Sequence, residues 1–405
     1  MRATTLAIMA TRSQDQQLVA QMASSHGSAK PPPPSSSLPS HPPLDAREAP
    51  APCAVVPSFG WHPWFSHQLY DDTTTTTIAA GTQPTTNEAD GKHCGDDAPA
   101  ASKTAHYQSV LQPAPKDGDF IASLPDPAPL SAFISATRKH LEAFPHALVG
   151  EVGLDKAFRL PQQWDASDAA ARDDSLTPGS REGRLLSPYR VRMAHQQAVM
   201  RAQLRLAGEL QRAVSVHGVQ AHGVLYDSVS ALWKGHERRV LSRREKRMDA
   251  LMAAQGRDAD ADADASGSSS SEDEDEDGGG DSGGIGSLVG KPRGKPFPPR
   301  ICLHSYTGSV DMLKQWLHPA VPCRVFLSFS TAVNLGTGGG RARLEEVLRA
   351  VPDDRLLVES DLHVAGEQMD AALEDMYRLV CGVKGWDLES GVRTVGKNFE
   401  RFIYG

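Results

Sequence analysis

The stretch LVGEVGLD (148–155) combines the pattern of a buried strand with acidic side chains near its end. Leu148 and Val149 suit a strand inside a sheet, but Gly150 and Glu151 follow at once. Glycine lets neighbouring backbone or ligand come close, and an acid at the end of a barrel strand commonly holds a metal or a proton. The stretch therefore predicts an acidic functional group at a strand end, with partners supplied by other strands.

Composition indicates one large domain with three long polar interruptions. The chain has 405 residues, and the segments 23–50, 71–106 and 254–298 are dominated by Pro, Ser, Thr, Gly and acidic residues. Such segments bury too little apolar surface to offset chain entropy, so we expect disordered insertions within a single domain, 1–405. About 300 residues remain, which is consistent with one large α/β domain.

The net charge of −8 comes from one insertion. Eleven acidic residues and no basic ones occur between Asp258 and Asp281, and removing these charges leaves the remainder at +3. A mildly basic body is compatible with a phosphate-bearing substrate but is not diagnostic of nucleic-acid binding. The acidic, Ser-rich insertion also indicates a segment for contacts with protein partners.

Cysteine usage and hydropathy indicate the compartment. The five cysteines form no CxxC pair and have no regular spacing, which predicts reduced thiols in a protein of the cytoplasm, the nucleus or both. No apolar run approaches membrane-spanning length, so we expect no membrane partner.

Short apolar runs alternate with helical patterns along the chain, which is typical of a parallel sheet. We expect seven strands, at 4–10, 53–60, 147–152, 213–218, 300–306, 323–330 and 354–360. Ser13 is the expected N-cap of the first helix. A closed barrel needs an eighth strand, and no glycine fingerprint of a doubly wound sheet follows the first strand. The expected fold class is therefore α/β, a TIM-barrel-like (β/α) fold that lacks its first strand.

Four of these strands end on side chains that bind metals well: Glu151, His217, His304 and Asp361. All strand ends of a barrel lie on one face, so these residues should converge. Two imidazoles and two carboxylates suit zinc, manganese or magnesium-like ions. A single such residue is more often a hydrogen-bonded polar group or a helix cap, but four at four strand ends favour a metal site.

Other candidates have competing interpretations. His62 in GWHPW (60–64) and His222 are near strand ends. His62 is either a buried supporting residue or a direct metal ligand, and His222 is either a substrate contact or a solvated loop residue. Cys302 is expected to be a buried, unreactive thiol. The stretch GTGGGRAR (336–343) lacks the ending of a phosphate loop, and the basic stretch 236–247 is either a solvated helix face or a nucleic-acid or nuclear-import contact.

Several motifs occur in a characteristic order: GWHPW, GEVGLD, a helix containing Gln196 and Gln197, SVHG, HSYTG, LLVESD and VGKNFERF. Together they resemble the TatD-type metal-dependent deoxyribonucleases over nearly the whole chain outside the insertions. The resemblance implies a TIM barrel with two divalent metal ions, whether Mg, Mn or Zn, that hydrolyses the phosphodiester bonds of DNA with metal-activated water. DNA is thus the expected substrate.

The resemblance also implies roles for individual residues. Glu151 would bridge the two metal positions, His217 and His304 would hold one ion, and Asp361 would hold the other and help to position the water. Glu151 and Asp361 are therefore the expected catalytic residues. Separately from the resemblance, their positions near strand ends make His62 and His222 the expected substrate-binding residues.

Two departures from the family pattern leave the activity of this chain open. The first strand of the family carries a His-x-His pair, which occurs nowhere in this sequence, and Val219 stands where the family often has arginine. With seven strands, 4–10 and 354–360 should have unpaired outer edges. The alternatives to a nuclease are a catalytically impaired TatD-like interaction protein and an amidohydrolase-like barrel that acts on a small molecule.

Overall fold

The computed structural model describes most of the chain with several gaps. The described residues are 3–27, 53–73, 102–164, 172–173, 176, 179–242, 244–245, 247–248, 294–336 and 340–405. Most of each expected insertion lies outside them. The margins were predicted wrongly, because residues 23–26 belong to helix α1 (Ser13–His26), residues 103–106 begin helix α2 (Lys103–Val110), and Phe297 is buried.

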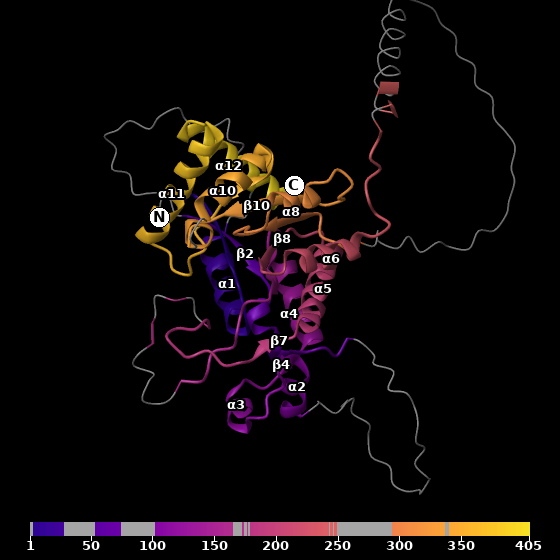
Figure 1. The fold of residues 1–405 in the computed structure, drawn as a ribbon, viewed down its shortest axis with the longest axis vertical. Coiled ribbons are helices and arrows are strands. Elements are labelled where there is room, and N and C mark those ends of the chain that lie inside the picture. Colours follow the sequence, from indigo (N-terminus) through magenta and orange to yellow (C-terminus); the bar gives the residue numbers. More distant parts are fainter. Residues whose placement is uncertain are drawn as a thin grey trace, which may run out of the picture.

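One parallel sheet of seven strands forms the centre of the molecule (Figure 1). Its strands, in spatial and chain order, are β1 (Thr5–Met9), β2 (Ala54–Phe59), β6 (Leu148–Asp155), β8 (Val214–Val219), β9 (Arg300–Leu303), β10 (Arg324–Phe329) and β11 (Leu356–Val358). All seven expected strands are confirmed, and the sheet is curled into a half-barrel. Among the described residues no strand pairs with the outer edge of β1 or of β11.

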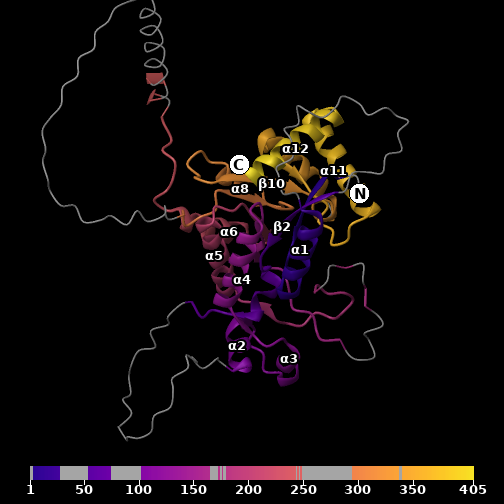
Figure 2. The same ribbon diagram turned by 180° about the vertical axis from the view of Figure 1, so that it is seen from behind.

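Helices cover the outer face of this sheet (Figures 1 and 2). They are α1, α4 (Leu130–Ala143), α5 (Met193–Glu209), α6 (His222–Trp233), α8 (Val310–Trp316), α10 (Gly340–Ala350) and α11 (Glu367–Lys384). The short helix α9 (Thr331–Asn334) directly follows β10 at its carboxyl end. Strand residues such as Val149 and Leu327 pack with helix residues such as Leu204 and Val229 in the main core. The N-cap of α1 is Arg12 rather than Ser13.

The inner face of the half-barrel is apolar at one end. Phe326 and its strand neighbours Val56, Leu148, Cys302 and Leu357 pack against Phe402 and Ile403 of the last helix, α12 (Leu388–Tyr404). Arg300 at the start of β9 donates to the carbonyls of Phe402 and Ile403 at 2.7 and 3.1 Å. Side chains two positions further along a strand share the same face. The polar residues that follow this apolar cluster along the strands therefore line the carboxyl end of the half-barrel.

Several short elements surround the carboxyl end and were not expected. They are the 3-10 helix η2 (Pro63–Gln68), helix α3 (Gly118–Ser123), and the short strands β3 (Leu69–Tyr70), β4 (Leu111–Gln112), β5 (Ala128–Pro129) and β7 (Arg190–Val191). A separate cluster that includes Tyr107, Leu111 and Val191 holds this region together. No helix in the described part of the chain is long and apolar enough to cross a membrane.

Candidate metal centre

Strand β6 carries Glu151 inside the strand rather than at its end, because β6 continues to Asp155. Its pairing with β8 shifts register between Val149 and Val152. Such irregularities re-aim side chains next to functional sites. Gly153 is required for the pairing, since a Cβ on it would lie 2.0 Å from the backbone oxygen of His217. The glycine-rich sequence of this strand therefore lets β6 and β8 meet closely beside Glu151.

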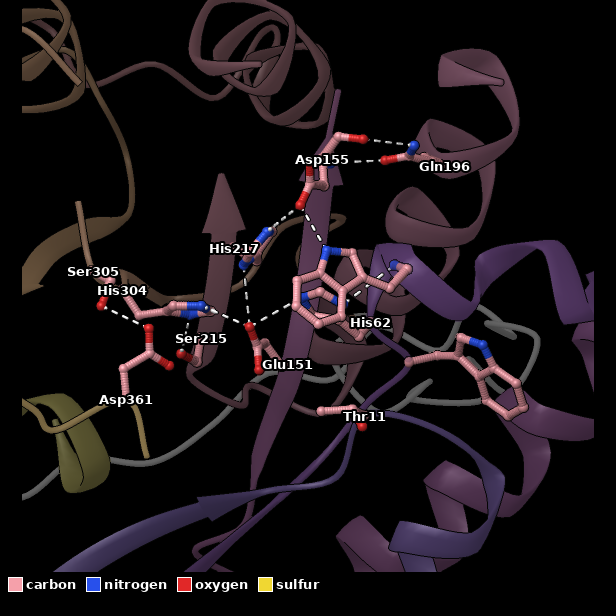
Figure 3. Close-up of polar contacts among 12 residues, drawn as sticks. Thr11, His62, Glu151, Asp155, Gln196, Ser215, His217, His304, Ser305 and Asp361 are labelled. Atoms are coloured by element: carbon pink, nitrogen blue, oxygen red, sulfur yellow. Dashed lines mark hydrogen bonds and ion pairs between the residues drawn. The ribbon is translucent and has the colours of Figure 1, made fainter. Parts of the chain in front are cut away.

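Three imidazoles surround one oxygen of Glu151 (Figure 3). Glu151 Oε1 lies 3.1 Å from His62 Nε2, 3.2 Å from His217 Nδ1 and 2.8 Å from His304 Nε2. His62 follows β2, His217 lies on β8, and His304 follows β9. The convergence expected for Glu151, His217 and His304 is therefore present, and His62 joins it.

The second nitrogen of each ring indicates which imidazoles can bind a metal. His62 Nδ1 accepts from the backbone N–H of Trp64 at 3.2 Å, so Nε2 carries the proton of the neutral ring and donates to Glu151. His217 Nε2–H donates to Asp155 Oδ2 at 3.2 Å, so in the neutral ring Nδ1 keeps the lone pair that faces Glu151. His304 Nδ1 contacts Ser215 Oγ at 3.1 Å, so Nε2 can face an ion. A partner on the far nitrogen is typical of metal-binding histidines.

The ionisation of the cluster matches this arrangement. Burial alone would raise the pKa of Glu151, but the adjacent His62 and His304 and hydrogen bonds from the imidazoles hold it well below its usual value. Burial alone would lower the pKa of His217, but hydrogen bonds to Asp155 and Glu151 raise it to about 10. Burial lowers the pKa of His62, and the neighbouring Glu151 offsets this only in part. The two carboxylates thus draw one positive charge to His217 when a proton is available.

A divalent cation would supply the positive charge that, in its absence, the second proton on His217 supplies. Distance alone selects His62, Glu151 and His217, whose ligand atoms lie within 4.8 Å of one another. The hydrogen bond from Trp64 to His62 favours instead Glu151, His217 and His304 as the ligands, with His62 as a donor to Glu151. In its neutral ring His62 carries the proton on Nε2 and has no lone pair toward the centre, whereas neutral His217 and His304 can turn Nδ1 and Nε2 to an ion that displaces their second proton. Nitrogen and carboxylate donors of this kind suit zinc or manganese.

Asp361 lies on the other side of His304 and belongs to a second acidic group (Figure 3). Ser305 Oγ lies 3.1 Å from Asp361 Oδ2 and 2.5 Å from Glu359 Oε1. Burial raises the pKa of Glu359, the neighbouring His304 opposes that shift, and Asp361 adds to it. Asp361 is exposed, so its carboxylate reaches solvent at the mouth of the site.

Sequence reasoning missed the role of Asp155, although it lies in the opening stretch. Besides His217, its side chain accepts from Trp64 Nε1 at 2.6 Å and from the backbone N–H groups of Ala157 and Phe158 at 2.7 and 2.8 Å. These bonds hold the pKa of Asp155 at about 2 against the effect of burial. Asp155 follows Glu151 by four residues in the same strand, and this even spacing could have indicated that both side chains lie on one face.

Gln196 on α5 hydrogen-bonds to the backbone at the carboxyl end of β6. Its side-chain oxygen accepts from the backbone N–H of Asp155 at 2.8 Å, and its amide donates to the Asp155 carbonyl at 3.0 Å. Gln197 instead donates to Ser228 on α6. Of the two glutamines in the predicted motif, Gln196 is thus the one that supports the site.

The remaining candidates lie outside the Glu151 cluster. His222 begins α6, and its Nε2 contacts Thr307 Oγ1 at 3.1 Å rather than Glu151. Cys302 is buried, and burial raises the pKa of its thiol, as expected for an unreactive residue. Within GTGGGRAR, α10 begins at Gly340, and residues 337–339 lie outside the described ranges.

Imidazole and carboxylate side chains that meet at the carboxyl ends of parallel barrel strands are typical of metal-dependent hydrolases. The chain matches the family described as TatD related DNase over residues 44–404, and it belongs to that family. The TatD family is metal-dependent, and its members include hydrolases.

Known proteins similar to this chain carry varied descriptions. The Cut9-interacting protein scn1 of Schizosaccharomyces pombe is 33% identical over 357 residues, which cover 87% of this chain and 84% of that protein. The uncharacterized deoxyribonuclease YMR262W of Saccharomyces cerevisiae is 23% identical over 360 residues, covering 86% and 82%. The crystal structure of YJJV, a TatD homologue from Escherichia coli, is 11% identical with a TM-score of 0.44, covering 99% and 87%.

Proposed function

We propose that this protein is a divalent-metal-dependent phosphodiesterase that cleaves DNA. The observation that carries the proposal is the convergence of His62, His217 and His304 on one oxygen of Glu151. A divalent ion at this centre would polarise a phosphoryl oxygen and acidify a water molecule. Membership of the TatD family and the description of the yeast relative as a deoxyribonuclease support DNA as the substrate.

Each residue around the centre has a separate role in this proposal. Glu151, His217 and His304 would hold the ion, and His62 keeps the Glu151 carboxylate oriented through its Nε2–H. Asp155 fixes the ring of His217 with its Nδ1 lone pair toward the centre. Asp361, which is exposed and contacts Ser305, would hold the attacking water and accept its proton. Glu151 and Asp361 would hold a second ion, and Mg, Mn and Zn are the candidates to compare for both ions.

The test is hydrolysis of a DNA oligonucleotide and of a small chromogenic phosphodiester with Mg²⁺, Mn²⁺ or Zn²⁺. We expect turnover that a chelator abolishes and that falls by at least about a thousandfold in Glu151→Gln, because the central ligand is lost. Arg205→Gln, an exposed residue of α5, is the matched control and should retain activity. Turnover that survives chelation or Glu151→Gln would refute the proposal.

A second candidate function is protein interaction. The 33% identical relative is described as a Cut9-interacting protein, and the sequence lacks the His-x-His pair expected of the family's first strand. We propose the acidic run 258–281 as a contact segment for such a partner. Purified chain and the Cut9 counterpart should co-elute in gel filtration, and deletion of 258–281 should separate them. Co-elution unaffected by the deletion would remove this segment from the proposal.

We also propose that the protein works in the cytoplasm, the nucleus or both. Cys53, Cys302, Cys323 and Cys381 are free thiols, which agrees with a reducing compartment. A fluorescent fusion would test the location, and accumulation in a secretory compartment would contradict it.

A further inference from the structure

A cavity of about 800 Å³ lies at the start of α6, beside the carboxyl ends of β6 and β8, the strands that carry Glu151 and His217. It lies where β6 and β8 end together, because Asp155 pairs with Val219 and the Lys156 N–H donates to the Val219 carbonyl at 3.0 Å. Its wall includes Lys156, one residue beyond the Asp155 that holds His217, and His222, which begins α6. The cavity is therefore lined by residues that directly follow β6 and β8, the two strands that carry Glu151 and His217.

Three cationic side chains line this cavity: Lys156, Arg159 and Arg190. No acidic residue of the described chain lines it, and within the described ranges none of the three cations forms an ion pair with a carboxylate. Lys156 and Arg190 are exposed, and Arg159 is half-buried. Unpaired positive charge gathered in a cavity attracts anions, and the walls focus the field.

Local contacts hold these cations in place. Arg159 Nε donates to the carbonyl of Ser187 at 2.8 Å, which ties the segment after β6 to the segment before β7. Arg190 Nη1 donates to the carbonyl of Lys156 at 3.2 Å, which brings Arg190 close to Lys156. Both arginines use part of their guanidinium for these bonds and keep further N–H groups for a ligand.

The first turn of α6 adds to this charge. His222, Gly223 and Val224 line the cavity, and the N-cap residue Ala221 makes no side-chain capping bond. The start of a helix carries partial positive charge, so α6 reinforces the attraction that the three cations exert.

From this cavity we propose a subsite for the phosphate of a nucleic-acid strand next to the phosphate being cleaved, held by Lys156, Arg159 and Arg190. This inference rests on the proposed phosphodiesterase function of the adjoining centre. A polynucleotide presents evenly spaced phosphates, and cations placed beside a cleavage centre hold the strand in register without reading its sequence. The subsite thus favours a polymeric substrate over a small phosphodiester.

The test measures binding without catalysis. Fluorescence anisotropy of a labelled single-stranded DNA oligonucleotide, with chelator present, gives the affinity as a function of salt for the full chain. Each phosphate contact with a single strand contributes about 0.7 to the slope of log affinity against log salt. We expect Lys156→Gln/Arg190→Gln to reduce that slope by about 1.4 and to weaken binding several-fold at low salt.

Arg205→Gln is the matched control because it removes a positive charge on α5 about 18 Å along the helix from Met193 at the cavity. It should leave the slope unchanged. An oligonucleotide that does not bind, or a double variant with the wild-type slope, overturns the subsite. A chain that binds DNA with the expected slope change but hydrolyses no phosphodiester refutes the proposed function and leaves the subsite intact.

Discussion

Two groups of three histidines lie close together in this protein and have opposite environments. The first group is His62, His217 and His304, and the second is His67, His106 and His195. The 3-10 helix η2 connects them, because His62 is its N-cap and His67 lies near its other end. Residue type is therefore the same in both groups, and only the surroundings differ.

The first group encloses a carboxylate, and the second bonds to backbone. His106 Nε2 lies 2.7 Å from the carbonyl of His67, and His195 Nε2 lies 2.9 Å from the carbonyl of Ser66. Burial lowers the pKa of all three rings, that of His67 to about 3. These histidines hold η2 against α2 and α5. The comparison teaches that a carboxylate enclosed by the rings, more than the number of imidazoles, distinguishes a candidate metal centre from a structural cluster.

The largest expected effect is that of Glu151→Gln on metal affinity. The substitution removes the charge on which the first group converges, so Mn²⁺ or Zn²⁺ affinity measured by titration calorimetry should fall by more than about 100-fold. His195→Gln, in the second group, should leave that affinity unchanged. Equal losses of metal affinity in Glu151→Gln and His195→Gln would mean that the first group of histidines is no more a metal centre than the second.

Asp155→Asn should cause the second-largest loss of metal affinity. Asp155 orients His217 through a contact of 3.2 Å, and loss of such a partner costs about 10- to 100-fold in metal affinity. Without metal, NMR titration should also show the His217 pKa falling from about 10, because an amide stabilises the imidazolium less than a carboxylate does. An unchanged titration would mean that Glu151 alone sets the charge of His217.

His67→Gln tests the second group through the pH dependence of stability. The folded-state pKa of about 3 lies below the ordinary value of 6.5, so the unfolded chain binds more protons between these values. The contribution of His67 is complete above pH 6.5 and declines as pH falls, by about 2 kcal/mol between pH 7 and 5.

Urea unfolding should show this part of the decline missing in His67→Gln. His236→Gln, at an exposed histidine, is the control and should retain the wild-type dependence. A His67→Gln curve parallel to that of the wild type would show that His67 is not the neutral buried group described.

The smallest expected effect is that of His62→Gln on metal binding. Glutamine retains an N–H donor for Glu151, so affinity should fall by less than about tenfold with unchanged stoichiometry. A loss as large as that of Glu151→Gln would identify His62 as a direct ligand and would reverse the assignment made from its bond with Trp64.

Much of the fold and part of the site followed from local pattern. Alternating apolar and helical segments predicted all seven strands of the sheet, and parallel strands place their carboxyl ends on one face. The sequence by itself therefore predicted that Glu151, His217 and His304 lie together. The order of motifs added the family, to which the chain does belong.

Only the tertiary structure decided how these side chains meet. That Asp155 orients His217, that Trp64 directs the proton of His62 to Glu151, and that Lys156 and Arg190 share a cavity depend on contacts between distant segments. Periodicity along a chain encodes which face a residue occupies, because it reflects local backbone geometry. It does not encode which nitrogen of a ring faces which oxygen, since that depends on packing across strands and helices far apart in sequence.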